Sequence, residues 1–150
     1  MALKIPPLLQ VLIALLLMTL VHHLVPTFTL SFALSAYLAS LLLVIAVSIG
    51  VLAIYNFRQH NTTVNPIKPE LSSQVVDSGI YQYSRNPMYL AMCIALVAYA
   101  IYLENPLTLF VCWLFVRYIS SYQIQPEERI LTQLFGSAYR DYQARVRRWL

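Results

Sequence analysis

Two groups of polar residues, separated by a long apolar stretch, could hold a charged small molecule. The first group contains tyrosines, an arginine and an asparagine, and the second contains an arginine and two adjacent glutamates. An arginine can pair with a carboxylate and a glutamate with an ammonium group, so together they suit a zwitterionic ligand. Tyrosine rings can contact a cation, which is worth about 0.5–2 kcal/mol. The groups are Tyr81, Tyr83, Arg85, Asn86 and Tyr89, and Arg117, Glu127 and Glu128.

The elements that would position these residues are membrane helices. Hydrophobic residues make up 59% of the 150 residues and charged residues only 11%, and the mean hydropathy is +0.64. No Asp, Glu, Lys or Arg lies between Lys4 and Arg58, a length sufficient for two spans of about 20 residues. Glu104-Asn105-Pro106 interrupts a second apolar region and predicts a turn there. We therefore expect one all-α integral membrane domain with about four spans, at 8–25, 30–56, 88–103 and 106–122.

The positions of the cations predict the orientation of the spans. The ten basic residues lie on the N-terminal stub, the central loop (57–87) and the C-terminal tail, with Arg117 near the inner end of the fourth span. The turns at 26–29 and 104–106 carry no cation, so the positive-inside rule places both termini and the central loop in the cytoplasm. The first span lacks a small-residue cleavage site and is expected to stay as an anchor. The predicted location is the bacterial inner membrane.

The same cations indicate what the protein contacts. Lysine and arginine next to membrane spans adjoin anionic lipid head groups. No motif for reading nucleic acid accompanies them. We therefore expect the lipid bilayer, and not nucleic acid, as the partner, and the oligomeric state stays open.

The C-terminal tail is predicted to form two amphipathic helices over 126–148. Pro126 suits the first position of a helix, and Glu127 and Glu128 fall in its first turn, where the helix dipole favours negative charge. Gly136-Ser137 indicates a stop followed by a new N-cap. The second helix is expected to lie on the membrane surface or to fold over the irregular central loop. Its apolar positions are Tyr139, Tyr142, Val146 and Trp149.

Several other kinds of site are not indicated. The three glycines, Gly50, Gly79 and Gly136, do not make the glycine-rich turn of a Rossmann-type nucleotide site, and no serine nucleophile elbow is present. His22-His23 lacks further ligands at metal spacing. Cys93 and Cys112 lie in predicted spans, where a thiol acts as a small apolar group. Neither a metal site nor a disulfide is predicted.

Two segments follow the motif order of a known family. NPIKPELSSQVVDSGIYQYSRNPMYLAM and, after the predicted hairpin, PEERILTQLFGSAYRDYQARVRRW resemble the isoprenylcysteine carboxyl methyltransferase family and related membrane phospholipid methyltransferases. The family pattern is Gly-x-Tyr, Arg-His-Pro-x-Tyr-x-Gly, Glu-Glu, Phe-Gly-x-x-Tyr-x-x-Tyr and a basic-Val pair, and the resemblance covers residues 61–149. Asn86 replaces the usual His and Ala91 the usual Gly. Asparagine can hydrogen-bond a ligand but cannot titrate near neutral pH.

The resemblance implies an integral membrane enzyme that transfers a methyl group from S-adenosylmethionine to a lipophilic acceptor and leaves S-adenosylhomocysteine. By the same resemblance, the acceptor group would be a carboxylate, an amine or another small nucleophile. The cofactor would lie between the inner ends of the last two spans, under the tail helices, with Arg145 and Arg85 as the catalytic residues and Arg145 orienting the acceptor. The residues implied in cofactor binding are Tyr81, Tyr83, Ser84, Arg85, Asn86, Pro87, Tyr89, Leu90, Arg117, Glu127 and Glu128.

Other classes of membrane protein remain open on the sequence alone. A reductase of the sterol type, which uses a nicotinamide cofactor, resembles these methyltransferases in its C-terminal architecture. A non-enzymatic small membrane protein would use the arginines as interfacial side chains and the tyrosines as an aromatic belt. A transporter is disfavoured because the first two spans lack an acidic residue that could couple ions.

Overall fold

In the part of the chain that the structure describes, all regular secondary structure is helical. The computed structural model describes residues 5–26, 33–59 and 75–150. The predicted all-α class is confirmed over these ranges. The elements are α1 (Pro7–Leu24), α2 (Ser35–Gln59), the 3-10 helix η3 (Gly79–Gln82), α3 (Pro87–Tyr102), α4 (Thr108–Ile119), the π-helix η4 (Ser120–Ile124), α5 (Gln125–Phe135) and α6 (Ser137–Arg145).

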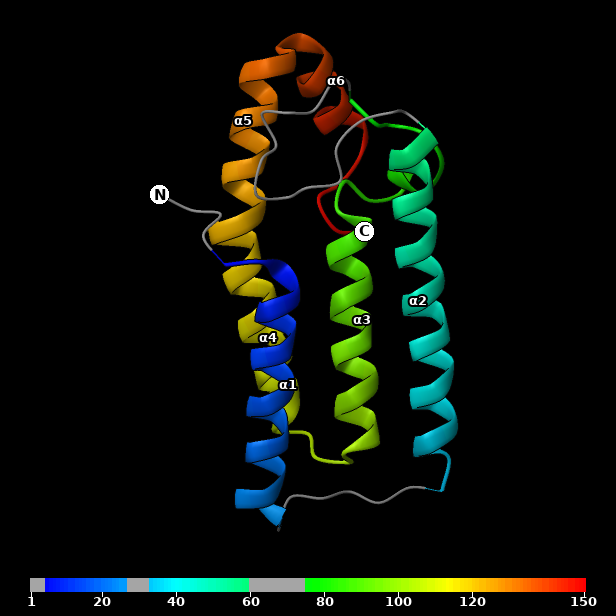
Figure 1. The fold of residues 1–150 in the computed structure, drawn as a ribbon, viewed down its shortest axis with the longest axis vertical. Coiled ribbons are helices and arrows are strands. Elements are labelled where there is room, and N and C mark those ends of the chain that lie inside the picture. The colour runs from blue at the N-terminus through cyan, green and yellow to red at the C-terminus, as the bar shows by residue number, and fades with distance from the viewer. Residues whose placement is uncertain (1–4, 27–32, 60–74) are drawn as a thin grey trace.

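Helix α3 is the centre of the bundle (Figure 1), with α2 on one side and α1 and α4 on the other. The buried face of α2 carries Ala39, Ala46 and Ala53, which recur every seven residues. Small side chains let two helices approach closely, and a Cβ added to Gly50 would lie 3.7 Å from Ala91 of α3. On the other side, α1, α3 and α4 share an apolar core that includes Met18, Leu96 and Phe115.

The four predicted spans coincide in position with α1 to α4. Of the described helices, α1 and α2 are long and apolar enough to cross a membrane, and α3 is apolar but shorter. Crossing by all four helices and the cytoplasmic orientation stay predictions. Several sequence predictions fall outside the described residues: those on Lys4 and Lys68, on most of the turn at 26–29, on the start of the second span, and on the loop over 60–74.

The fourth predicted span continues beyond residue 122. α4, η4 and α5 form one uninterrupted helical rod (Figure 1). Pro126, predicted to open a separate helix, is the second residue of α5. Proline has no N–H for an i−4 bond, but in the π turn just before it the N–H of Gln125 donates five residues back, to the carbonyl of Ser120. Pro126 thus lies in the first turn of α5, as predicted, and residues 123–125, which the sequence predictions left between two helices, are helical because the hydrogen-bond pattern changes there.

The second tail helix is shorter than the predicted range to 148. Gly136, with φ of 57°, separates α5 from α6 as predicted, but α6 ends at Arg145 and Val146 is extended. The last five residues, 146–150, here termed the C-terminal segment, turn back toward the start of α3 (Figure 1). The backbone N–H of Arg85 donates to the carbonyl of Arg147 at 3.0 Å. Tertiary hydrogen bonds therefore replace the last helical turn.

Replacing Gly79 with Ala is expected to destabilise the protein by about 2 kcal/mol or more, because its φ is 57° and the left-handed region penalises a Cβ by about 1–2 kcal/mol. The added Cβ would also lie 2.0 Å from Nδ2 of Asn56, which donates to the carbonyl of Ser78. Thermal unfolding in detergent measures the loss. Gly136→Ala is the matched control, since Gly136 has the same φ but no atom within 4 Å of the added Cβ. Equal losses in both variants would contradict the contact with Asn56.

Candidate functional site

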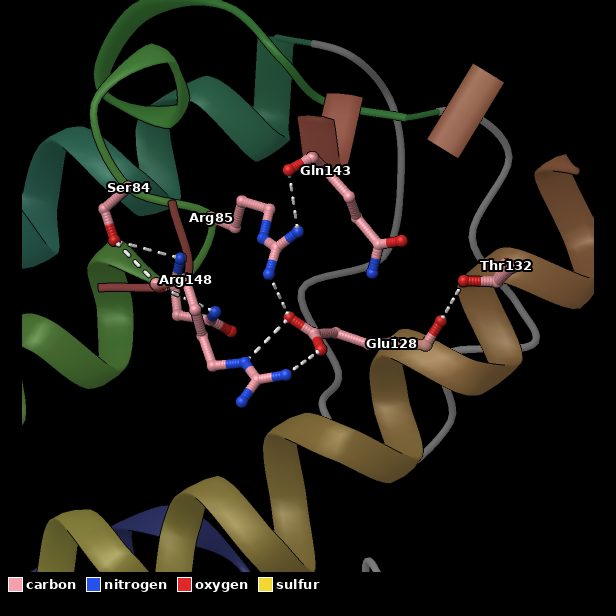
Figure 2. A network of polar contacts seen from close by, with 7 residues as sticks. Ser84, Arg85, Glu128, Thr132, Gln143 and Arg148 are labelled. Carbon is pink, nitrogen blue, oxygen red and sulfur yellow. Dashed lines mark hydrogen bonds and ion pairs between the residues drawn. The ribbon is translucent and has the colours of Figure 1, made fainter. Parts of the chain in front are cut away.

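The carboxylate of Glu128 forms the centre of the site and accepts hydrogen bonds from two arginines (Figure 2). Arg85 donates from Nη2 to Oε1 at 2.9 Å, and Arg148 donates from Nε to Oε1 at 3.1 Å and from Nη2 to Oε2 at 2.6 Å. The side chains of Arg85 and Glu128 are each only 10% exposed. Two cations around one carboxylate leave a net positive charge in a nearly buried place, where an anionic group would be stabilised.

The three members of this cluster come from distant parts of the chain. Arg85 lies in the turn between η3 and α3, Glu128 in the first turn of α5, and Arg148 in the C-terminal segment. Arg85 also donates from Nη1 to the carbonyl of Gln143 at 3.4 Å. Its Nε is buried and has no hydrogen-bond partner among the described residues. A buried donor without a partner is costly, and this one is available to an oxygen of a ligand.

Glu127 lies in a different environment from its neighbour. It accepts a hydrogen bond on Oε2 from the hydroxyl of Tyr89 at 3.0 Å, and no described arginine or lysine forms an ion pair with it. Burial raises the pKa of the Glu127 carboxyl to about 7; the bond from Tyr89 lowers this pKa and the charge of Glu128 raises it. One carboxylate is therefore ion-paired, while the adjacent one can gain or lose a proton near neutral pH.

A cluster of buried tyrosines lies beside these carboxylates, at the end of α2 and under α6. Tyr142 donates to the carbonyl of Tyr81 at 2.7 Å, and both pack with Tyr139, Ala53 and Val146. Burial raises the pKa of all three tyrosines. They are therefore neutral and tie η3 to the tail.

The structure brings several of the predicted site residues together. Arg85, Tyr89, Glu127 and Glu128 form the contacts described above. Ser84 and Asn86 contact the tail: Oγ of Ser84 and Nδ2 of Asn86 donate to the carbonyl of Arg148 at 3.4 and 3.0 Å. Pro87 is buried and is the first residue of α3. The backbone N–H of Leu90 donates to the carbonyl of Asn86. Tyr81 lies one layer away, in the tyrosine cluster.

Two of the predicted residues, Tyr83 and Arg117, lie apart from this cluster. The side chain of Tyr83 is 71% exposed. Arg117 is exposed on α4 and forms no ion pair with a described residue. Arg117 therefore has no contact with the two glutamates in the structure, and its role in cofactor binding stays a prediction.

Arg145 also lies outside the Glu128 cluster. Its Nη2 donates to Oδ2 of Asp77 at 3.1 Å, and the two side chains are 66% and 47% exposed. Both residues line an open cleft of about 350 Å³ between the loop before η3 and α6. The other lining residues are Ser78, Gln82, Tyr142 and Val146.

Two residues of the site were not predicted from the sequence. The sequence predicted Arg148 as part of the second tail helix, but this helix ends three residues earlier, at Arg145. Because arginine is a good helix former, no local signal indicates that the helix ends before Arg148. Gln123, buried in η4, hydrogen-bonds the hydroxyl of Tyr89. A glutamine just beyond an apolar span could have indicated a buried polar contact, but the π turn that directs it inward has no sequence signature.

Comparisons with known proteins agree with the motif pattern. The family described as phospholipid methyltransferase matches residues 34–138. The chain is 36% identical over 76 residues to a protein-S-isoprenylcysteine O-methyltransferase of Dictyostelium discoideum, covering 48% of this chain and 30% of that protein. It is 27% identical over 124 residues to the protein of the same name from Saccharomyces cerevisiae, covering 80% of this chain and 50% of that protein.

A third relative, an uncharacterized protein of Haemophilus influenzae, is 40% identical over 63 residues, which are 42% of this chain and all of that protein. The chain thus spans at most half the length of the two relatives that carry a functional name. No solved structure matches the chain significantly. The resemblance drawn from the motifs is confirmed, and the family match supports the predicted enzyme class of methyltransferase. The chain belongs to the phospholipid methyltransferase family.

Proposed function

We propose that this protein is an integral membrane methyltransferase that uses S-adenosylmethionine and acts on a lipophilic acceptor. The observation that carries the proposal is the cluster beside the Glu127–Tyr89 pair, in which the nearly buried Arg85 and Glu128 meet the partly exposed Arg148. The family match supports the reaction class. Neither a nicotinamide-dependent reductase nor a non-enzymatic protein is favoured by the relatives.

The residues of this cluster fit the amino-acid end of the cofactor. The arginine pair has one positive charge more than Glu128 neutralises, which suits a carboxylate, and the buried Nε of Arg85 is a donor awaiting an acceptor. The two adjacent carboxylates, Glu128 and ionised Glu127, suit an ammonium group. The remaining cofactor-binding residues we propose are Tyr81, Tyr83, Ser84, Asn86, Pro87, Tyr89, Leu90 and Arg117, as the motif resemblance implies.

The surrounding protein would exclude water from the reaction. S-adenosylmethionine supplies a methyl group on a sulfonium, which an acceptor displaces in line, so the protein must mainly position the two molecules. Tyr81, Tyr139 and Tyr142 form an uncharged wall beside the carboxylates. The C-terminal segment and α6 lie over the start of α3 (Figure 1) and are the proposed cover.

We propose that α1 to α4 all cross the membrane and that the site faces the cytoplasm. Arg58 lies in the last turn of α2 and Arg85 just before α3, while the tail arginines lie on α5, on α6 and after them. Figure 1 shows the end of α2, the start of α3 and the helices α5 and α6 at the same end of the bundle. This gathering is what the positive-inside rule favours for a cytoplasmic end. A lipophilic acceptor would then enter from the cytoplasmic leaflet.

The direct experiment is a thermal-shift measurement on the purified protein in detergent. S-adenosylmethionine and S-adenosylhomocysteine should raise the melting temperature, because a ligand that binds only the folded state stabilises it by about 2.7 kcal/mol at a concentration 100 times its Kd. Reduced nicotinamide nucleotide is the control and should give no shift. A shift with the nicotinamide alone would favour the reductase, and no shift with either sulfur compound would remove the proposal.

Replacing Arg145 with Ala should impair methyl transfer about tenfold or more while leaving cofactor binding intact. Arg145 lines the open cleft and not the Glu128 cluster, and we propose that it orients the acceptor; a hydrogen bond to a charged group is worth about 1.5–3 kcal/mol. Its exposed pair with Asp77 contributes little to stability. Transfer of labelled methyl into membrane extract measures the effect, with exposed Arg140→Ala on the same helix as control. Loss of cofactor binding in Arg145→Ala would contradict the role.

A further inference from the structure

The pair between Glu128 and Arg148 has the features of a contact that a ligand can replace. Both oxygens of Glu128 are occupied in the structure, and Arg148 makes two of the three hydrogen bonds to them. An ammonium group could reach this carboxylate only if one of the arginines gave up its place. A carboxylate entering at the same time would leave neither charge uncompensated.

Arg148 is the arginine that can move. Its side chain is 35% exposed, against 10% for Arg85. Arg85 has a second bond, to the carbonyl of Gln143, and its backbone N–H is bound to Arg147. No other described side chain holds the guanidinium of Arg148 (Figure 2).

The backbone around Arg148 is held in place independently of its side chain. The carbonyl of Arg148 accepts hydrogen bonds from the side chains of Asn86 and Ser84. Trp149 packs against the core that α1, α3 and α4 share. The guanidinium can therefore exchange partners while the C-terminal segment stays in position. Asn86 thus contacts the tail in the place where the family usually has histidine.

We propose that Arg148 is the residue that recognises the α-carboxylate of the cofactor, by exchanging Glu128 for that carboxylate when the zwitterionic end of the ligand binds. The ammonium group of the ligand takes the place on Glu128 that Arg148 leaves, and Arg85 keeps its bond to the same carboxylate. The inference rests on the proposed cofactor, and it adds Arg148 to the site as a specificity-determining residue. A ligand with only one of the two charges breaks the Glu128–Arg148 pair but leaves either Glu128 or Arg148 without a new partner. Such a ligand therefore binds more weakly than the zwitterion.

The test compares two probes by calorimetry on the full-length protein in detergent: S-adenosylhomocysteine and its analogue without the α-carboxyl group. The wild-type protein should prefer S-adenosylhomocysteine by at least about tenfold, the worth of one charged hydrogen bond. Arg148→Ala should reduce this preference to about twofold or less, because only the bond to the α-carboxylate is lost. Arg147→Ala is the matched control: it removes the same charge one position away, its side chain is exposed, and its carbonyl bond to Arg85 is retained.

Each outcome of this comparison is decisive. If Arg148→Ala lowers the affinity for both probes equally, Arg148 has a structural role only. If the preference for S-adenosylhomocysteine is unchanged, another residue binds the α-carboxylate. Either result overturns the inference. A wild-type protein that binds both probes equally also overturns it but leaves the proposed function standing. Binding of neither probe removes the proposed function itself. Arg148→Gln, which keeps most of the side-chain volume, replaces the alanine variant if that variant does not fold.

Discussion

The Glu128→Gln variant should lose the stabilisation by S-adenosylhomocysteine altogether. Glutamine keeps the shape of the side chain but removes the charge that two arginines share, and its amide nitrogen cannot accept their hydrogen bonds. Breaking a nearly buried ion pair on one side costs about 3–5 kcal/mol. The substitution also removes the counter-charge of the ligand's ammonium group, a bond worth up to about 3 kcal/mol. The affinity should therefore fall by about a hundredfold, since each 1.4 kcal/mol is a factor of ten.

The measurement must separate lost binding from lost stability, because the same substitution leaves Arg85 and Arg148 without a counter-charge. The melting temperature of the variant without ligand should be lower than that of the wild type. The ligand-induced shift is therefore read against the variant's own baseline. Arg129→Gln is a suitable control, since Arg129 is the exposed next residue of α5. A ligand-induced shift in Glu128→Gln equal to that of the wild type would exclude Glu128 from the site.

Glu127 should make the stability of the unliganded protein depend on pH. Burial raises the pKa of its carboxyl from 4.5 to about 7 in the folded state. Between these values the folded protein binds the proton more tightly than the unfolded chain does. The stabilisation is complete below pH 4.5 and is lost as the pH rises through about 7, with a slope of up to about 1.4 kcal/mol per pH unit.

Comparing the wild type with Glu127→Gln isolates this contribution. The free energies of unfolding of both proteins are measured from about pH 4 to 9. The wild-type value should fall relative to that of Glu127→Gln as the pH rises, and the difference should become constant above about pH 8. Tyr89→Phe gives a second check. The hydrogen bond from Tyr89 lowers the pKa of Glu127, so its loss should move the upper end of the window to higher pH. A parallel pH profile for wild type and Glu127→Gln would show that Glu127 does not titrate in this range.

Some features of the protein follow from the sequence through local physics. Apolar runs between Lys4 and Arg58 and around the turn at Glu104-Asn105-Pro106 locate the long helices, because helix length and hydropathy are local properties. Asn105 stabilises this turn in the structure, since its Oδ1 accepts the N–H of Leu107 at 3.1 Å. Motif order along the chain was sufficient to identify the family, which the comparisons confirm.

The tertiary structure decided which of the candidate residues meet. Glu128 was a candidate by its place in the motif, but its partner Arg148 depends on the end of α6 at Arg145, and that end is stabilised by hydrogen bonds to Ser84, Arg85 and Asn86, about sixty residues away in the chain. By charge alone, Arg117 and Arg145 were equally good candidates for partners of Glu128. In the structure Arg117 is exposed on α4 and Arg145 pairs with Asp77.

The sequence by itself therefore determined the helical class, the approximate helix positions, the family and the two motifs that supply the site. Only the tertiary structure decided the continuous rod through η4, the reversal of the C-terminal segment and the sharing of Glu128 by two arginines. The physical reason is that helix formation depends on neighbouring residues, whereas a helix end and an ion pair depend on which distant groups offer better hydrogen bonds.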